Sequence, residues 1–290
     1  MCDNTYSLVQ SRYGDIAKQS TNVQQHDKEE EIARAFGYSA EDLSSLPGKT
    51  NLGLSCGNPV GFANVKEGET VLDLGSGSGI DVFLAARKVG HNGQAIGVDM
   101  TRSMIELAEK NTQKAELSNV KFIESNINSI PLPDSSVDCI ISNCVINLVP
   151  ATDKAAVFRE IARLLKPGGR VAISDILARK PLPDHITSNM ALYVGCVAGA
   201  GQIVEYEEYL RQAGFEGMYT AIKRALSTDL LIGVFIVDTK SDLNLYKESS
   251  YLPQSSCCGG GLERKGTPSD IAALDFNEWV GSFQIYAVKA

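Results

Sequence analysis

Strand-like and helix-like segments alternate from about residue 68 to about residue 178. Short apolar runs such as "TVLDL" and "VDCIISN" are separated by amphipathic segments such as "IDVFLAARKVG". Parallel strands need a long crossover connection between them, and a helix usually supplies it. The pattern therefore predicts a doubly wound α/β core at residues 60–180, with a mostly parallel sheet and helices on both faces.

The remaining chain divides into three further segments. Residues 1–59 are expected to form a helical N-terminal segment that ends in a substrate loop. Residues 181–240 are expected to form a smaller α+β region for substrate binding, with helices at "HITSNMALYVGCVAGAG" and "VEYEEYLRQAGF". Residues 241–290 hold a flexible loop rich in serine, glycine and proline, followed by a last strand at "FQIYAVKA".

The charge and hydropathy of the chain exclude several classes of protein. A net charge of −8 and a pI near 5.0 argue against a nucleic-acid surface, and no apolar run is long enough for a membrane helix. The N-terminus shows no basic segment followed by an apolar one, so we expect a cytoplasmic protein whose seven cysteines are reduced. We expect a monomer, with neither nucleic acid nor a membrane as partner.

A glycine turn follows the first strand of the core. The segment "DLGSGSG" places Gly75, Gly77 and Gly79 between a buried strand and a helix, where glycine lets the backbone approach a ligand closely. The turn alone is not specific, because many nucleotide-binding folds share it. Asp73 lies two residues before the first glycine, and a carboxylate there would repel a pyrophosphate. It favours a positively charged cofactor without phosphates, and S-adenosylmethionine fits that description.

Further side chains are expected at the tips of the next two strands. Asp99 lies twenty residues after Gly79, where a ribose-binding carboxylate is expected. Met100 is placed to pack on adenine, and Asn126, followed by Ile127, is placed to bind its edge. Each residue alone could cap a loop, but their joint placement on successive strand tips favours a binding role. With this set, the core resembles the class I S-adenosylmethionine-dependent methyltransferases.

The position of Cys144 raises a separate question. Cys139 falls inside "VDCIISN" and is expected to pack in the core, whereas Cys144 follows that strand's carboxyl end, where open sheets bind ligands. Cys144 is either a structural filler or a thiol that holds a soft centre. Cys56 in "NLGLSCGNPV" and Cys196 in "YVGCVAGAG" also lie among small residues. Three separated thiols around a cleft could form a trigonal, all-sulfur site.

With these residues considered together, the chain closely resembles the arsenite methyltransferases. The segments that carry the resemblance are "YGD" at 13–15, "NLGLSCGNPV", "VLDLGSGSGIDVF", "SNCVINLV" and "YVGCVAGA". In that family the cysteines matching Cys56, Cys144 and Cys196 bind trivalent arsenic as thiolates. We also assign Tyr13 and Asn143, which lie in the first and fourth of these segments, to the cofactor site.

The resemblance implies a mechanism and a substrate. Trivalent arsenic, free or bound to glutathione, would exchange its hydroxides for three thiolates and become a neutral pyramidal centre. Its lone pair would point at the methyl group of S-adenosylmethionine, opposite the sulfonium sulfur. No general base would be needed, because arsenic has no proton to lose, and catalysis would consist mainly of positioning.

The chain departs from the family at its redox cysteines. Many members carry a cysteine between the tyrosine-glycine motif and the loop cysteine, but none lies between Tyr13 and Cys56 here, and Cys2 lies in an end that we expect to be disordered. We therefore expect reduction by an external thiol, either glutathione or a thioredoxin-like thiol reductase. Cys257 and Cys258, in a glycine-rich loop, are either a mobile dithiol that delivers arsenite or an exposed pair without a role.

Two alternatives stay open on the sequence. The first is a methyltransferase that acts on a small organic acceptor, in which the three cysteines only pack. The second is a thiol-based arsenic-binding protein without turnover. The glycine turn and Asp99 argue against the second, because a binder has no need of S-adenosylmethionine.

Overall fold

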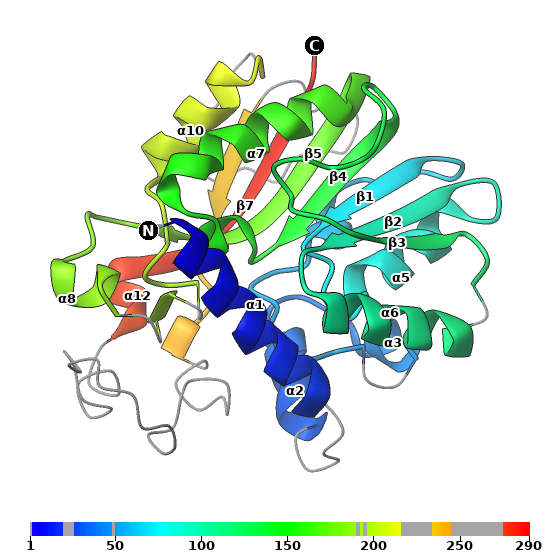
Figure 1. The fold of residues 1–290 in the computed structure, drawn as a ribbon, viewed down its shortest axis with the longest axis horizontal. Coiled ribbons are helices and arrows are strands. Elements are labelled where there is room, and N and C mark those ends of the chain that lie inside the picture. Colours follow the sequence, from blue (N-terminus) through cyan, green and yellow to red (C-terminus); the bar gives the residue numbers. More distant parts are fainter. Residues whose placement is uncertain are drawn as a thin grey trace.

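The computed structural model of the chain describes residues 2–19, 26–47, 50–115, 117–189, 192–193, 196–215, 234–244 and 275–290. In this part of the chain, seven strands form one sheet in the order β3-β2-β1-β4-β5-β7-β6 (Figure 1). The strands are β1 (Thr70–Leu74), β2 (Gln94–Asp99), β3 (Val120–Glu124), β4 (Val137–Asn143), β5 (Leu165–Ala178), β6 (Val234–Asp238) and β7 (Val280–Val288).

Helices precede the sheet and connect its strands. Cys2 begins the first helix, so the expectation of a disordered end at this residue was wrong. None of the helices within the described ranges is long and apolar enough to span a bilayer. They are α1 (Cys2–Gln19), α2 (His26–Ala35), α3 (Ala40–Ser44), α4 (Pro59–Phe62), α5 (Ile80–Val89), α6 (Arg102–Ala115), the 3₁₀-helix η2 (Ile146–Leu148), α7 (Ala151–Leu164), α8 (Asp184–Thr187), α10 (Ile203–Gln212) and α12 (Phe276–Trp279).

The strand directions confirm the predicted fold class. Strands β1 to β5 run parallel to one another, and β7 lies antiparallel between β5 and β6. The sheet is therefore doubly wound and mostly parallel, with one antiparallel edge. Because β6 and β7 come from beyond residue 180, the C-terminal part of the chain completes the same sheet. The division of the chain into four segments stays a prediction.

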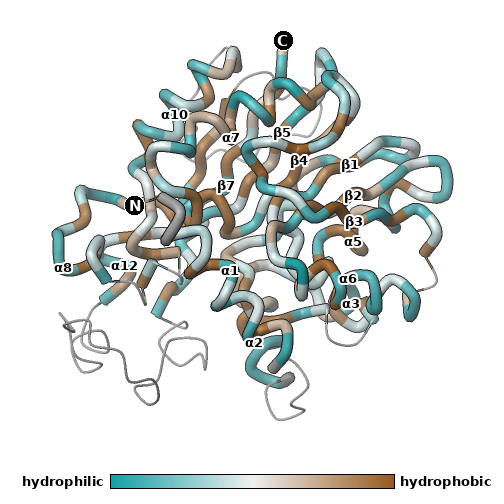
Figure 2. Tube along the Cα trace, in the orientation of Figure 1, coloured by the Kyte–Doolittle hydropathy of each residue, from teal (hydrophilic) through white to brown (hydrophobic). Residues whose placement is uncertain are grey.

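Successive side chains of a strand point to opposite faces, and both faces of this sheet are covered. Leu72 of β1 belongs to the same buried cluster as Phe158 of α7 and Tyr206 of α10. Val71, its neighbour in β1, packs instead in the cluster that contains Val82 of α5. Figure 2 shows hydrophobic residues concentrated along the strands and hydrophilic residues on the outer parts of α6 and α10. The core is thus two apolar layers on either side of the sheet.

The structure departs from the single helix expected over residues 185–201: residues 185–187 and 192–193 are helical, but residues 196–201 are not. Helix α8 ends at Thr187, and Cys196 lies in a turn with a φ of 64°. Gly199 and Gly201 follow within five residues, and glycine disfavours the helical state. A Cβ added at Gly199 would also collide with the carbonyl oxygen of Asn147, so this segment packs its backbone directly against the loop after β4.

Helix α1 lies across the carboxyl ends of the strands and packs against α6 (Figure 1). The hydroxyl of Tyr6 donates to a carboxylate oxygen of Asp153 at 2.9 Å, and Nε2 of Gln10 donates to the carbonyl of Met100 at 3.0 Å. These contacts tie the N-terminal helix to the loop after β2 and to α7. The first helix of the chain therefore forms part of the wall at this end of the sheet.

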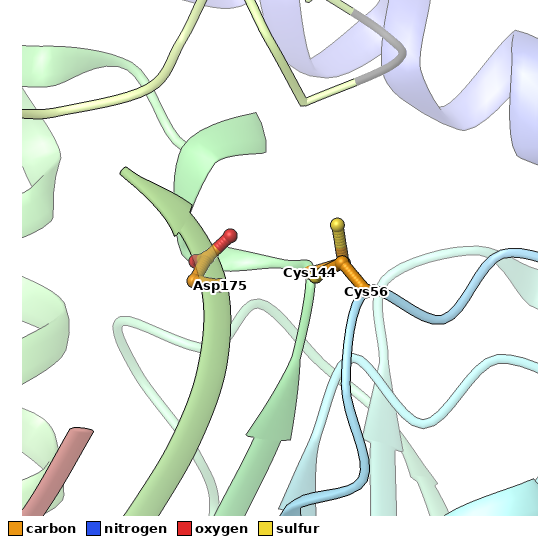
Figure 3. A group of neighbouring side chains, drawn as sticks. All are labelled: Cys56, Cys144 and Asp175. Atoms are coloured by element: carbon orange, nitrogen blue, oxygen red, sulfur yellow. The ribbon is translucent and has the colours of Figure 1, made fainter. Parts of the chain in front are cut away.

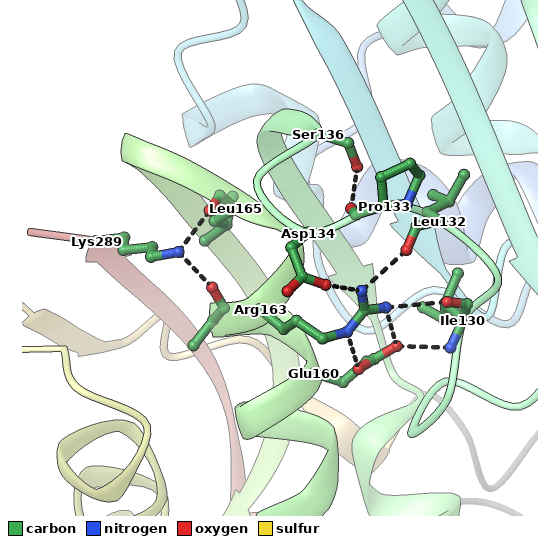
Figure 4. A network of polar contacts seen from close by, with 10 residues as sticks. Ile130, Leu132, Pro133, Asp134, Ser136, Glu160, Arg163, Leu165 and Lys289 are labelled. Atoms are coloured by element: carbon green, nitrogen blue, oxygen red, sulfur yellow. Dashed lines mark hydrogen bonds and ion pairs between the residues drawn. The ribbon is translucent and has the colours of Figure 1, made fainter.

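Arg163 of α7 holds the segment that connects β3 to β4 (Figure 4). Its guanidinium donates to the carbonyls of Ile130 at 3.0 Å and Leu132 at 2.9 Å, and it forms ion pairs with Glu160 and Asp134. Because this segment follows the tip of β3, the arginine restrains the same strand end at which cofactor-binding side chains are predicted.

We expect Arg163→Ala to lower the free energy of unfolding by about 2–3 kcal/mol, because two carbonyls and a largely buried carboxylate lose a charged donor. The matched control is Arg211→Ala on α10, whose pair with Glu208 is solvent-exposed and should contribute nothing measurable. Urea denaturation of both variants measures the difference. Equal urea midpoints for the two variants would show that the contacts of Arg163 do not stabilise the protein.

A candidate active site at the carboxyl ends of the strands

A pocket lies where the order of the sheet reverses. Strand β1 has β2 on one side and β4 on the other, and α/β sheets form a ligand-binding crevice at such a point. The wall of the pocket includes side chains of α1 and of the loops after β1, β2, β3 and β4. Nine residues predicted to bind the cofactor line it: Tyr13, Asp73, Gly75, Gly77, Asp99, Met100, Asn126, Ile127 and Asn143.

The glycines of the turn differ in what they do. Gly75 has a φ of 68°, and an added Cβ would collide with the methyl groups of Val145, in the loop after β4. Gly79 is instead the N-cap of α5, with a φ of 99°, and a Cβ there would lie 2.8 Å from Phe83 and 2.9 Å from Phe122. Gly79 is not among the residues that line the pocket. Its lack of a side chain instead lets α5 pack closely against the sheet.

We expect Gly75→Ala to destabilise the protein more than Gly77→Ala does. Both positions have positive φ, which costs an alanine roughly 1–2 kcal/mol. Only Gly75→Ala adds overpacking against Val145, about 1–3 kcal/mol more, because a Cβ at Gly77 has no neighbour within 4 Å. Thermal unfolding measures both variants. Adding Val145→Ala should recover the difference, and a cost that is equal in the two variants would contradict the close contact.

The carboxylate of Asp99 orients the glycine turn. Its Oδ2 accepts a hydrogen bond from the backbone N–H of Gly77 at 3.0 Å, and its Oδ1 accepts one from Thr101 at 2.8 Å. The side chain at the end of β2 thus holds together the loop after β1 and the start of α6. Asp99, which the sequence predicted only as a ligand for ribose, therefore also stabilises the backbone that forms the pocket.

The pocket is acidic and incompletely hydrogen-bonded. Burial raises the pKa of Asp73, Asp81 and Asp99, and repulsion from the other two raises that of Asp73 further. No lysine, arginine or histidine is among the described residues that line the pocket. The buried hydroxyl of Ser76 lacks a hydrogen-bond partner within the same part of the chain. These features suit a ligand that carries positive charge and polar groups and has no phosphate.

Two residues of the pocket region escaped the sequence analysis. The hydroxyl of Tyr38 donates to Oδ1 of Asp81 at 2.8 Å, and Nδ2 of Asn143 donates to Oδ2 of the same carboxylate at 3.0 Å. Oδ1 of Asn143 in turn accepts the backbone N–H of Cys56 at 3.1 Å. Asp81 could have been found as a carboxylate in the first turn of the helix after the glycine turn. Nothing in the sequence around Tyr38 indicates this contact.

The three predicted cysteines lie near one another beside the pocket, and Cys144 interacts with each of the other two. The sulfur atoms of Cys56 and Cys144 and a carboxylate oxygen of Asp175 all lie within 4.8 Å of one another (Figure 3). The thiol of Cys196 donates to the carbonyl oxygen of Cys144 at 3.0 Å. All three cysteines are buried and free of disulfides. Cys144 alone also lines the pocket, so it joins the pocket to the thiol cluster, by which we mean Cys56, Cys144 and Cys196.

Two cysteines of the thiol cluster have a left-handed backbone. The φ angles of Cys144 and Cys196 are 58° and 64°. Residues other than glycine, asparagine and aspartate seldom adopt this region. The N–H of Cys144 donates to the carbonyl of Ser174 at 2.8 Å, which holds the turn against β5. Such backbone conformations persist where the surrounding structure imposes them and are concentrated at functional sites.

The loop that carries Cys56 is held by distant parts of the chain. The hydroxyl of Ser282, in β7, donates to the carbonyl of Cys56 at 2.6 Å. The next residue, Gly57, lies so close to β5 that a Cβ would approach Ser174 to 2.5 Å. The position of this thiol therefore depends on the C-terminal strand as well as on the core.

The thiols are protonated in the free protein at neutral pH. Burial raises the pKa of Cys56 to about 12 and is also the main cause of the raised pKa of Cys144. The pKa of Cys196 is raised first by its interaction with the Cys144 thiol and then by burial. Because burial favours the uncharged form of a thiol, an incoming substrate meets neutral S–H groups.

Asp175 is a further residue that sequence reasoning missed. Its carboxylate accepts hydrogen bonds from Nδ2 of Asn147 at 2.9 Å, from the N–H of Ile176 at 2.9 Å and from the hydroxyl of Tyr206 at 3.1 Å. Burial raises its pKa to about 6. The buried Lys154 donates to Oδ1 of Asn147 at 3.3 Å. This polar network supports the thiol cluster from the side of β5 and α10.

The vicinal pair Cys257 and Cys258 lies outside the described residues, so the hypothesis of arsenite delivery by this pair stays a prediction. The flexible loop expected within residues 241–290 also stays a prediction, because residues 245–274 are not described.

Comparisons with known proteins agree with this geometry. Residues 65–214 match a protein family described as a methyltransferase domain. An arsenite methyltransferase of Halobacterium salinarum is 46% identical over 210 residues, which cover 72% of this chain and 52% of that protein. An arsenite methyltransferase of Homo sapiens is 33% identical over 217 residues, which cover 71% of this chain and 57% of that protein. The crystal structure of an arsenic(III) S-adenosylmethionine methyltransferase from Chlamydomonas reinhardtii matches with a TM-score of 0.56 at 29% identity, covering 89% of this chain and 73% of that one.

Fold, pocket and family match together define the class: the chain belongs to the methyltransferase-domain family. The resemblance to arsenite methyltransferases expected from the motifs is confirmed by relatives that bear this name. The chain spans about half the length of the first curated relatives that it matches.

Proposed function

We propose that this protein transfers a methyl group from S-adenosylmethionine to trivalent arsenic held by Cys56, Cys144 and Cys196. One observation carries the proposal: two buried thiols from segments far apart in the sequence, Cys56 and Cys144, lie close together at the edge of the pocket, and the buried Cys196 contacts Cys144. Cysteines that only filled space would not need the left-handed backbone found at Cys144 and Cys196.

The pocket fits S-adenosylmethionine by its chemistry. When bound, the cofactor supplies an electrophilic methyl group on a sulfonium sulfur. Asp73, Asp81 and Asp99 would hold its positively charged and hydroxyl groups, and the unpartnered hydroxyl of Ser76 offers a further hydrogen bond. Apolar side chains of the pocket wall, Met100 among them, would cover the adenine. The absence of basic residues in the described lining is consistent with a cofactor that has no phosphate.

The chemistry of capture follows from the protonated thiols. Three thiols and one As(OH)3 give one As(SR)3 and three water molecules. Three S–H and three As–O bonds break, while three As–S and three O–H bonds form, and no net charge is created in the buried site. Arsenic keeps its lone pair and has no proton to lose, so the site needs no general base. The thiol cluster would act by positioning the arsenic atom.

Binding of the cofactor should depend on pH. Burial raises the pKa of Asp81 from 3.8 to about 6, and the ionisable groups that face it are Tyr38 and Asp73. Without a ligand, Asp81 loses its proton at a lower pH in the unfolded chain than in the folded protein. The stability of the folded state therefore decreases as the pH rises from about 4 to about 6. A cation in the pocket favours the ionised carboxylate. We therefore expect the affinity for S-adenosylmethionine, measured by calorimetry, to increase from pH 5 to pH 7, and a decrease would contradict the assignment.

The proposed function is tested by incubating the protein with arsenite, S-adenosylmethionine and a thiol reductant. Arsenic species are then separated by chromatography with elemental detection, and methylated arsenic is the expected product. Binding of S-adenosylmethionine without any methylated arsenic would contradict the proposal and direct attention to small organic acceptors. Tight arsenite binding without turnover would instead indicate a thiol-based binder.

We further propose that the oxidised product is reduced by an external thiol, either glutathione or a thioredoxin-like reductase. Support comes from the sequence, in which no cysteine lies between Tyr13 and Cys56 to form an internal disulfide. Free buried thiols fit a reducing compartment such as the cytoplasm, and we propose that the protein acts there as a monomer.

A further inference from the structure

We propose that a hydrogen-bonded chain formed by Tyr38, Asp81 and Asn143 couples the cofactor pocket to the thiol cluster, so that a cationic cofactor and arsenite each strengthen the binding of the other. The inference rests on the proposed function. It assigns these three side chains as positioning residues, none of which binds arsenic.

The chain of contacts is continuous from one site to the other. Asp81 lines the pocket, and both of its oxygens are occupied, Oδ1 by the hydroxyl of Tyr38 at 2.8 Å and Oδ2 by Nδ2 of Asn143 at 3.0 Å. Nδ2 of Asn143 has two hydrogens and shares them among three acceptors, which are Asp81, the hydroxyl of Tyr38 at 2.8 Å and the carbonyl of Gly57 at 2.8 Å. On the other side, its Oδ1 accepts the N–H of Cys56 at 3.1 Å.

Asn143 thus holds the Cys56 loop at two backbone atoms. It accepts from the N–H of Cys56 and donates to the carbonyl of Gly57, the residue that follows. The Asn143 amide can make both bonds only while its plane is fixed, because its acceptor oxygen and its donor nitrogen lie on opposite sides of the group. The carboxylate of Asp81 fixes that plane, and Tyr38 fixes the carboxylate.

The charge of the pocket gives the coupling its direction. Asp81 is buried beside Asp73 with no basic residue in the described lining, so a positive ligand strengthens its ionised state. An ionised carboxylate accepts stronger hydrogen bonds than a neutral carboxyl group does. Occupation of the pocket by a cation would therefore hold Asn143, and with it Cys56, in the position that completes the thiol cluster.

The test measures arsenite binding by calorimetry at pH 5, where a pKa of about 6 leaves the Asp81 carboxyl mostly protonated in the free protein. Binding is measured with and without saturating sinefungin, in a phosphine reductant that does not compete for arsenic. Sinefungin carries an amine in place of the sulfonium and has no transferable methyl group, so binding is measured without turnover. We expect sinefungin to tighten arsenite binding about tenfold, and arsenite to tighten sinefungin binding by the same factor, because coupling free energies are reciprocal.

Tyr38→Phe is the test variant, since it removes one hydroxyl and keeps the ring. We expect it to reduce the tenfold coupling to about twofold or less while both ligands still bind. The matched control is Tyr286→Phe, which lies in the same buried cluster as Tyr38 but outside the hydrogen-bonded chain. It should keep the full coupling.

The outcomes separate the two proposals. If both ligands bind the wild type without affecting each other, or if Tyr38→Phe keeps the full coupling, this inference is wrong and the proposed function stands. If the wild type does not bind arsenite under either condition, the proposed function fails, and the inference that rests on it fails with it. A coupling lost equally in Tyr38→Phe and Tyr286→Phe would indicate general loosening of the cluster and would also overturn the inference.

Discussion

Replacement of Cys144 by serine is expected to lower the rate of arsenic methylation by at least about a hundredfold, because a displaced reacting centre alone can cost that much. A serine oxygen cannot replace a thiolate as a ligand for a soft centre, so arsenic would be held by two thiols and its lone pair would lose its direction. The measurement is the initial rate of methylated arsenic formation at saturating S-adenosylmethionine. Binding of S-adenosylhomocysteine should persist, which would show that the pocket is intact.

The matched control for this variant is Cys139→Ser in the same segment of chain. Cys139 lies inside β4, is fully buried in the cluster that contains α5, and is not part of the thiol cluster. A hydroxyl there should lower the free energy of unfolding by about 1–3 kcal/mol and leave the methylation rate of the folded protein unchanged. Equal losses of activity in the two variants would mean that Cys144 acts only through stability.

Replacement of Asp99 by alanine is expected to weaken the binding of S-adenosylhomocysteine by about a hundredfold, or about 3 kcal/mol. The loss has two parts: the carboxylate predicted to bind ribose, and the two backbone hydrogen bonds from Gly77 and Thr101 that shape the turn. Calorimetry measures the affinity. Asp99→Asn keeps an oxygen acceptor, so we expect it to lose less than Asp99→Ala.

The control for Asp99 is Glu124→Ala, since Glu124 is its partner in the register of β2 and β3. Glu124 forms an exposed ion pair with Arg102 and does not line the pocket. Its removal should leave the affinity for S-adenosylhomocysteine unchanged. An equal loss in both variants would mean that the strand end, and not the Asp99 carboxylate, determines binding.

Much of the fold and of the pocket could be predicted because its determinants are local. The alternation of apolar strands with amphipathic helices gives a parallel sheet, and the glycine turn, Asp99 and Asn126 each follow directly on a strand. Strand ends of a parallel sheet meet at one edge, so side chains at successive tips are neighbours wherever the sheet forms. The sequence also placed Cys139 in a strand interior and Cys144 beyond its end, and this difference of five positions separates a core thiol from one at the site.

Contacts between residues far apart in the chain could not be predicted and became visible only in the folded protein. No local pattern could indicate that Ser282 holds the carbonyl of Cys56 across 226 positions, or that Asp175 lies beside its sulfur. The turn at Cys196, where a helix was expected, depends on the close packing of Gly199 against the loop after β4. Which side chains reach the edge of the sheet could be predicted, because the position of a residue relative to the end of its strand depends only on the neighbouring residues in the sequence. The exact neighbours of each thiol were decided by burial, since desolvated polar groups must find partners wherever the fold brings them.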